Sequence, residues 1–175
     1  MVYDQLALRE LPICICAFLK LMSFFWLRFS NLVLVLWVGS LLALGAIAAP
    51  VLFSALDDKQ LAGMLAGKMF TVGAWVGIAA GVYLLLYRLI RDGAAALKSL
   101  FFWLVLFMWL LTLAGHFGIQ PILQNLKDQA LPLAVMQSVF ADRFSQWHGI
   151  SRILWIIQAL LGVVLVWRSG LATSK

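Results

Sequence analysis

Four long apolar runs without charged residues constrain this chain more than any other feature of its sequence. The hydrocarbon core of a bilayer is about 30 Å thick, so a helix needs about 20 apolar residues to cross it. The runs are 29–56, 69–87, 99–126 and 153–167, and the last reaches spanning length when 148–152 is added. Pro50 interrupts the first run and Pro121 breaks the third. The pattern predicts four transmembrane helices.

The overall composition excludes a soluble domain. The chain is 65% hydrophobic and only 11% charged, whereas soluble domains are about 45–50% apolar and about 25% charged. We therefore expect an all-α fold, an integral membrane four-helix bundle with short interfacial helices. One transmembrane domain would cover 29–168, with an N-terminal segment over 1–28 and a cytoplasmic tail over 169–175.

The apolar segment 11–27 is ambiguous, because Pro12 and Lys20 interrupt it. A lysine at the centre of a span costs about 2.5–3.5 kcal/mol on insertion scales. We interpret the segment as an interfacial helix or an extension of the first span, with a further span as the alternative. Translation could also start at Met22 rather than Met1, since the residues after Met22 lead directly into the first run.

The basic residues predict the orientation in the membrane. With four spans, both termini and the 88–98 connection lie on one side, which carries Arg9, Lys20, Arg28, Arg88, Arg91, Lys98, Arg168 and Lys175. The other side carries fewer, namely Lys59, Lys68, Lys127, Arg143 and Arg152. The positive-inside rule places both termini in the cytoplasm. No basic stripe with interleaved aromatic residues is present, so nucleic acid is not an expected partner.

Two connections on the outer side have a helical pattern. Asp58 is a candidate N-cap for a helix over 59–70, and the apolar residues of 132–147 fall on one helical face. Such a stripe is typical of a helix that lies on the membrane surface. The alternative is an N-terminal extension of the next span.

Small residues recur at four-residue spacing in the second run and before it. They are Gly63, Gly67, Gly73, Gly77 and Gly81. Glycines at this spacing form a groove that another helix can approach closely. The series favours packing inside one bundle, and a homodimer face is the alternative. Of two substitutions, we expect Gly77→Leu to disrupt the bundle more than Leu85→Phe, because we expect Leu85 to contact lipid.

The polar residues of the last helix gather on one side. At 100° per residue, a wedge about 100° wide holds Phe144, His148, Ser151, Arg152 and Trp155, with Gln158 at its edge. An arginine inside a span is costly unless it faces the bundle or extends to the interface. The stripe therefore predicts either a site or internal hydrogen bonds.

The two histidines of the chain, His116 and His148, are expected at similar depth on adjacent antiparallel helices. Met64, Met69 and Met136 are assigned to the same side. Imidazole together with thioether favours copper(I), and two histidines from facing helices can ligate haem iron. In the alternative interpretation His148 bonds a neighbouring backbone group or serine, and His116 merely lies at the membrane boundary. No catalytic motif is present, because the sequence lacks H-E-x-x-H, G-x-S-x-G and a P-loop.

Three motifs follow one another along the chain: WVGSLLALGAIAAPVLF at 37–53, LAGMLAGKMF at 61–70 and FSQWHGIS at 144–151. In this order they resemble the bacterial membrane family related to transmembrane protein 205. The resemblance implies a four-helix membrane domain without an established activity, and it matches Phe144, His148 and Ser151 to that family's last helix. Trp155 stands where the family often has Asn. The chain is also distantly similar to the copper-resistance D-type membrane proteins, whose bundles handle metal or haem.

Two functions remain open from the sequence. The first is a non-enzymatic membrane protein, structural or accessory to transport, with the lipid bilayer and further copies of itself as partners. The second is a copper- or haem-binding membrane protein that uses His116 and His148.

Overall fold

The computed structural model describes residues 13–130 and 135–172, and all regular elements in these ranges are helices. This helical structure confirms the predicted all-α fold, and four continuous helical stretches are long and apolar enough to cross a membrane. The candidate spans are Phe24–Ala55, Lys59–Lys98, Leu100–Ala130 and Ala141–Ser169. The elements in chain order are α2 (Ile13–Leu42), η1 (Ala43–Ala48), α3 (Ala49–Ala55), α4 (Lys59–Asp92), η2 (Gly93–Lys98), α5 (Leu100–Leu113), η3 (Ala114–Ile119), α6 (Gln120–Ala130), η4 (Val135–Gln137) and α7 (Ala141–Ala172).

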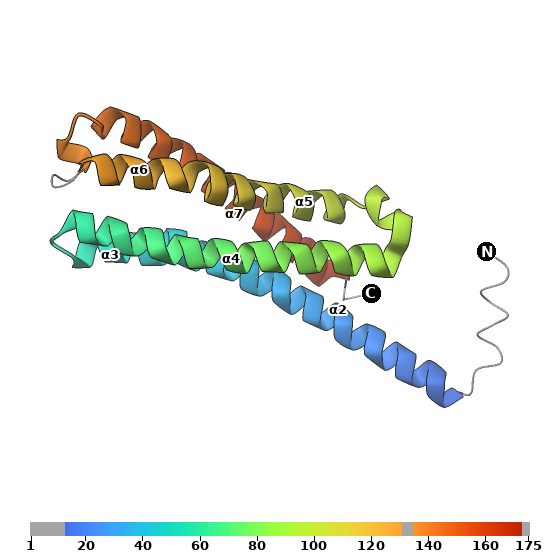
Figure 1. The fold of residues 1–175 in the computed structure, drawn as a ribbon. Coiled ribbons are helices and arrows are strands. Elements are labelled where there is room, and N and C mark those ends of the chain that lie inside the picture. The colour runs from blue at the N-terminus through green and yellow to red at the C-terminus, as the bar shows by residue number, and fades with distance from the viewer. Residues whose placement is uncertain (1–12, 131–134, 173–175) are drawn as a thin grey trace.

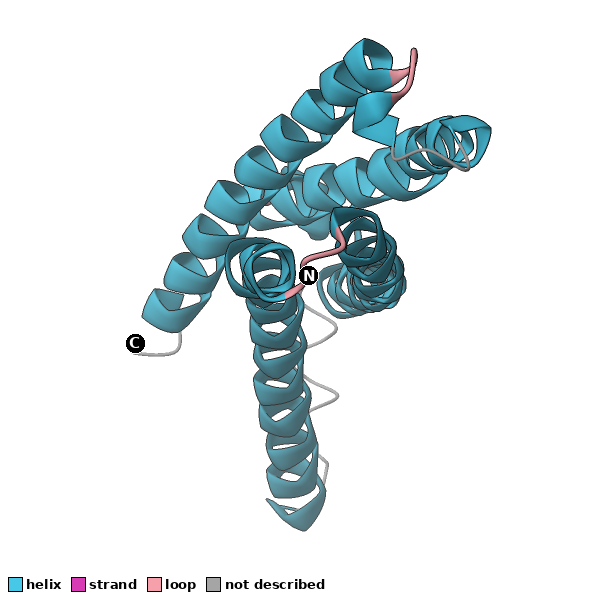
Figure 2. Ribbon diagram, turned by 90° about the vertical axis from the view of Figure 1, so that its left-hand side faces the viewer, coloured by secondary structure: helices cyan, strands magenta, loops and turns pink. Residues whose placement is uncertain are grey.

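The four spans form a ring in which each contacts two neighbours. Both α4 and α7 pack against α2 and α5. One end of the bundle, called here the α3–α4 end, holds the turn from α3 to α4 and the start of α7 (Figure 1). The opposite end, called the η2 end, holds η2, the start of α2 and the end of α7 (Figure 1). The first part of α2 extends away from the other helices (Figure 2).

The centre of the ring is an apolar core to which every span contributes. Its largest side chains are almost completely buried, with exposed fractions of 0–2%. They include Trp37 from α2, Leu84 from α4, Met108 from α5 and Leu165 from α7. They belong to one cluster of buried residues. The core is therefore filled at the level where the four helices meet.

The segment 59–70 is the first part of α4 and is continuous with the span, so the structure does not separate it as an interfacial helix. Asp58 is its N-cap, as the sequence predicts: the Asp58 carboxylate accepts the backbone N–H groups of Gln60 at 2.8 Å and Leu61 at 3.1 Å. These bonds satisfy two N–H groups that the first turn of a helix leaves without a partner.

The stripe predicted over 132–147 does not lie on one helix. The structure has a short turn of helix, η4, followed by bends, and α7 begins at Ala141. From Ala141 onward the extension alternative describes the chain, because α7 runs without a break into the last span. Leu133 lies outside the described residues. At the N-terminus α2 runs unbroken from Ile13 to Leu42, which corresponds to the extension alternative for 13–27.

A π-helical turn lies just before the proline in each of the first and third spans. η1 ends two residues before Pro50, and η3 ends two residues before Pro121. Proline has no N–H, and its ring clashes with the carbonyl four residues earlier. In η1 the register widens, so that the Ala49 N–H donates to the Leu44 carbonyl, five residues back. Such a local adjustment keeps the backbone bonded inside a membrane, and both spans continue past their prolines.

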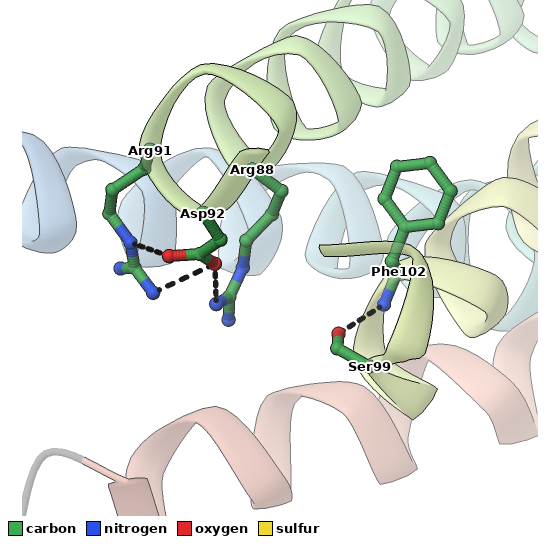
Figure 3. A network of polar contacts seen from close by, with 5 residues as sticks. All are labelled: Arg88, Arg91, Asp92, Ser99 and Phe102. Atoms are coloured by element: carbon green, nitrogen blue, oxygen red, sulfur yellow. Dashed lines mark hydrogen bonds and ion pairs between the residues drawn. The ribbon is translucent and has the colours of Figure 1, made fainter. Parts of the chain in front are cut away.

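Ionic contacts and a cap define the turn between α4 and α5 (Figure 3). Asp92 accepts from Arg88 at 3.1 Å and from Arg91 at 2.7 Å. Gly93 follows with φ of +55°, a conformation that favours glycine. The Ser99 hydroxyl then caps α5 by accepting the Phe102 N–H at 3.2 Å. The η2 end is thus closed by a well-bonded turn.

Candidate functional site

The last helix, α7, uses part of its polar face to bond two other spans. The Trp155 indole N–H donates to the Leu41 carbonyl at 3.1 Å, just before the π-turn of the first span. Gln158 is buried, and its amide donates to the Met108 carbonyl at 3.2 Å and to the Thr112 hydroxyl at 2.5 Å. Two residues one turn apart on α7 therefore tie it to α2 on one side and α5 on the other.

The rest of that face makes fewer polar contacts. Ser151 is half-buried and Arg152 is exposed. Neither forms a side-chain hydrogen bond within the parts of the chain that are described. The predicted polar face thus divides into an inner half that holds the helices together and an outer half that is available at the surface.

Three of the series glycines and Gly45 lie opposite bulky side chains of other helices. A Cβ at Gly81 would collide with Trp109, and one at Gly77 would lie 2.6 Å from Trp37 Nε1. Gly45 in η1 faces Trp155 in the same way, and Gly73 faces the tip of Leu44. The Trp109 indole also donates to the Ile78 carbonyl of α4 at 3.1 Å. The absence of a side chain at these glycines therefore leaves room for tryptophan and leucine side chains of the same chain.

The two glycines near the start of α4 are used differently. A Cβ at Gly63 or Gly67 would meet its neighbours only at 3.8–4.0 Å, which is ordinary contact. Their carbonyls instead accept side-chain donors: Lys127 Nζ bonds Gly63 O at 3.1 Å, and Gln120 Nε2 bonds Gly67 O at 3.2 Å. Gln120 lies 3.3 Å from Thr71 Oγ1 as well. A polar seam therefore joins α6 to α4 at the α3–α4 end.

Lys127 connects this seam to the predicted face of α7. Its ammonium group lies 5.8 Å from the centroid of the Phe144 ring, and His148 stacks on that ring with centroids 5.8 Å apart. Lys127, Phe144 and His148 thus form one cluster, built from α6 and α7.

Lys127 and Gln120, like Thr71, are not marked as site residues by any motif of the sequence, where Lys127 counts only toward the orientation. They are seven positions apart, a spacing that places two residues on the same face of a helix. This spacing is inconspicuous in the sequence, because 120–130 contains the end of the third apolar run and the start of the connection that follows it.

The predicted metal residues have separate surroundings. His116 packs at 5.2 Å from the Trp75 ring and 4.7 Å from the Phe117 ring. No ring contact or hydrogen bond joins it to His148 within residues 13–130 and 135–172. The His116 Nδ1 atom is buried and has no hydrogen-bond partner in those ranges. Met64, Met69 and Met136 are exposed to 45%, 38% and 61%.

No group of three or more His, Cys, Asp or Glu side chains that could hold a metal occurs in the part of the chain that the structure describes.

Removal of the Lys127 ammonium group tests the seam. Lys127→Met is expected to lower the free energy of unfolding by about 1 kcal/mol, because the Gly63 carbonyl loses a charged donor. Thermal unfolding in detergent measures the loss. The control is Lys98→Met, which changes an exposed lysine at the η2 end. Equal effects of the two substitutions would show that the contact does not hold α6 to α4.

An all-helical bundle with four candidate spans, closed by internal hydrogen bonds, defines a multi-pass membrane domain. The chain belongs to the family described as Domain of unknown function (DUF4149), which matches residues 32–132. The match runs from the middle of α2 to just beyond α6, so α7 lies outside it. Neither a curated protein nor a solved structure matches the chain. The comparisons give no support to the resemblance to the transmembrane protein 205 or copper-resistance families.

Proposed function

We propose that the chain is a non-enzymatic protein of the bacterial inner membrane, structural or accessory to transport, with both termini in the cytoplasm. The observation that carries this proposal is the filled centre of the ring. Leu34, Leu84, Met108 and Leu165 have exposures of 0–1% and come from all four spans. A pore or an intramembrane active site needs a polar or water-filled cavity, and these side chains occupy the place where one would lie.

The internal polar groups support the same proposal. Gln158, Thr112 and the Trp109 and Trp155 indoles bond to neighbouring helices. Each is thus used to hold the bundle together, and none is free to bind a substrate. The orientation rests on the basic bias of the sequence, to which Arg88 and Arg91 at the η2 end contribute. A homo-oligomer would use another surface than Gly77 and Gly81, since both are buried within the chain.

Water access to the core tests the proposal. In a chain with Cys14→Ser and Cys16→Ser, single cysteines replace Met108 and Leu165, and a water-soluble maleimide is added to native membranes. We expect no labelling at these two positions, whose exposure is 0%, and rapid labelling at a cysteine replacing Val139, which is 91% exposed. Labelling of the core cysteines at the rate of the Val139 position would contradict a closed interior.

A second candidate function is copper or haem binding by His116 and His148. The observation that favours it concerns His116 alone: its Nδ1 atom is buried and has no hydrogen-bond partner within the described ranges, while His148 lies against Phe144. A neutral imidazole carries one nitrogen that accepts or ligates, and leaving a buried polar atom unsatisfied costs about 1–3 kcal/mol. A bound metal would remove that cost.

Copper(I) titration and the visible spectrum test this candidate on the purified protein. Binding that is weakened at least about tenfold by His116→Ala and by His148→Ala, equal to a loss of about 1.4 kcal/mol for each, would support a shared site. A Soret band that both substitutions remove would support haem. Absence of that band, together with copper affinity unchanged by either substitution, would contradict the candidate.

A further inference from the structure

A groove of about 480 Å³ lies on the outside of the bundle, between the first span and α4. Leu44 of η1 lies against Gly73 of α4, and both line the groove. Val72 and Val76 of α4 and Ala43 of the π-turn also line it. The volume is within the range of about 300–1,000 Å³ that is typical of ligand sites.

Lys68 is the one charged residue among those that line the groove. It is exposed, and its ammonium group forms neither an ion pair nor a hydrogen bond within the described residues. All other lining residues except the Ser40 hydroxyl are apolar, and that hydroxyl already bonds the Trp37 carbonyl at 2.9 Å. The groove thus has one cationic position and an apolar body.

The position of Lys68 along α4 corresponds to the level of lipid headgroups. Lys68 and Arg88 bracket the uncharged stretch 69–87 and stand about 30 Å apart at the rise of an α-helix, which is the thickness of the hydrocarbon core. From Lys68 the groove passes Val72 and reaches Val76, about 12 Å deeper. It therefore runs from the headgroup level of one leaflet into its acyl region.

We propose that this groove binds one phospholipid molecule, with the phosphate on Lys68 and an acyl chain between the π-turn of the first span and α4. An anionic head joined to an apolar tail is the chemistry that a single lysine at the mouth of an apolar groove complements. The phosphate also offsets the cost of a lysine that has no carboxylate partner near the membrane boundary. The site is independent of the closed core described above, because it lies on the surface of the ring.

Native mass spectrometry of the full chain, delipidated and titrated with palmitoyl-oleoyl phosphatidylglycerol, tests the proposal. The wild type is expected to retain one lipid molecule. Lys68→Gln is expected to weaken this binding about tenfold, the effect of losing one charged hydrogen bond, and Lys68→Arg is expected to preserve it. Ala43→Phe, which fills the groove from an exposed position, is expected to weaken it at least as much.

Matched controls separate the groove from general surface effects. Ala46→Phe adds the same ring at an exposed position of η1 that does not line the groove. Arg143→Gln removes an exposed charge near the start of α7, at the same end of the bundle as Lys68. Both controls are expected to bind the lipid as the wild type does.

Three results would overturn the proposal. One is a Lys68→Gln variant with unchanged binding, and another is diacylglycerol of the same chains bound as tightly as phosphatidylglycerol. The third is a dimer that Ala43→Phe dissociates, since a second copy of the chain would then occupy the groove.

Discussion

Gly81→Leu is expected to lower the free energy of unfolding by about 3 kcal/mol, the upper part of the range for overpacked cores. A Cβ at this position would lie 2.8 Å from Trp109 Cγ and 3.1 Å from Trp109 Cβ. Trp109 Cβ is fixed to the backbone of α5, and rotation of the indole away from the new side chain would break its 3.1 Å hydrogen bond to the Ile78 carbonyl. The collision therefore forces α4 and α5 apart, and unfolding in mixed micelles with a denaturing detergent measures the loss.

Gly39→Leu is the matched control for Gly81→Leu. Gly39 is an exposed glycine on α2, and nothing lies within 4 Å of a Cβ built there. We expect the control to change stability by no more than about 0.5 kcal/mol. If both leucines cost the same, the contact with Trp109 is not the cause of the loss, and helix propensity is not the cause either, because leucine is a better helix former than glycine.

Trp37→Ala is expected to lower stability by about 3–5 kcal/mol, the range for large-to-small changes in a packed core. Trp37 is 2% exposed and is the largest of the fully buried side chains. It fills the space opposite Gly77 and belongs to the central cluster, so its removal leaves a cavity between α2 and α4. The same unfolding assay applies, with Trp167→Ala as the control because Trp167 is 70% exposed. Equal losses for the two alanine variants would contradict a packed centre.

The sequence predicted the four spans because uncharged runs of sufficient length have few alternatives in a chain of this composition. It also predicted the N-cap, since Asp58 immediately precedes a helical run. The way in which the first and third spans pass Pro50 and Pro121 could not be predicted, because a proline in a helix is compatible with a kink or with a local change of the helix. Only the tertiary structure shows that the π-turns η1 and η3 accommodate them.

The spacing of the glycines alone could not predict which side chains they contact. The spacing predicted close packing at Gly73, Gly77 and Gly81, but it could not show that each receives a side chain, from η1, α2 and α5 in turn. Periodicity also cannot tell which leucine of a run faces lipid. Leu85, expected at the lipid surface, packs against the central cluster, and Leu86 is the exposed one at 52%. Leu86→Phe is therefore the better control for substitutions in the glycine series.

The candidate site was predicted in part for a similar reason. Trp155 and Gln158 were placed on one face by helical geometry, yet their acceptors, Leu41 O and Met108 O, are backbone atoms more than 40 residues away in sequence. Backbone acceptors carry no sequence signature. For the same reason the contact of Lys127 with Gly63 O became visible only in the folded chain.

The most direct test of the account is a double-mutant cycle between Trp37 and Gly77, because the central claim is that the series glycines of α4 receive large side chains within a closed core. The unfolding free energy is measured for the wild type, Trp37→Ala, Gly77→Leu and the double variant. The leucine is expected to be costly in the wild type, where Trp37 Nε1 lies 2.6 Å from its Cβ position. In the Trp37→Ala background the leucine occupies the vacated space, so the two losses are expected to differ from additivity by at least about 1 kcal/mol in the stabilising direction. Additive losses within about 0.5 kcal/mol would contradict the account, since they would show that the two residues do not share a site.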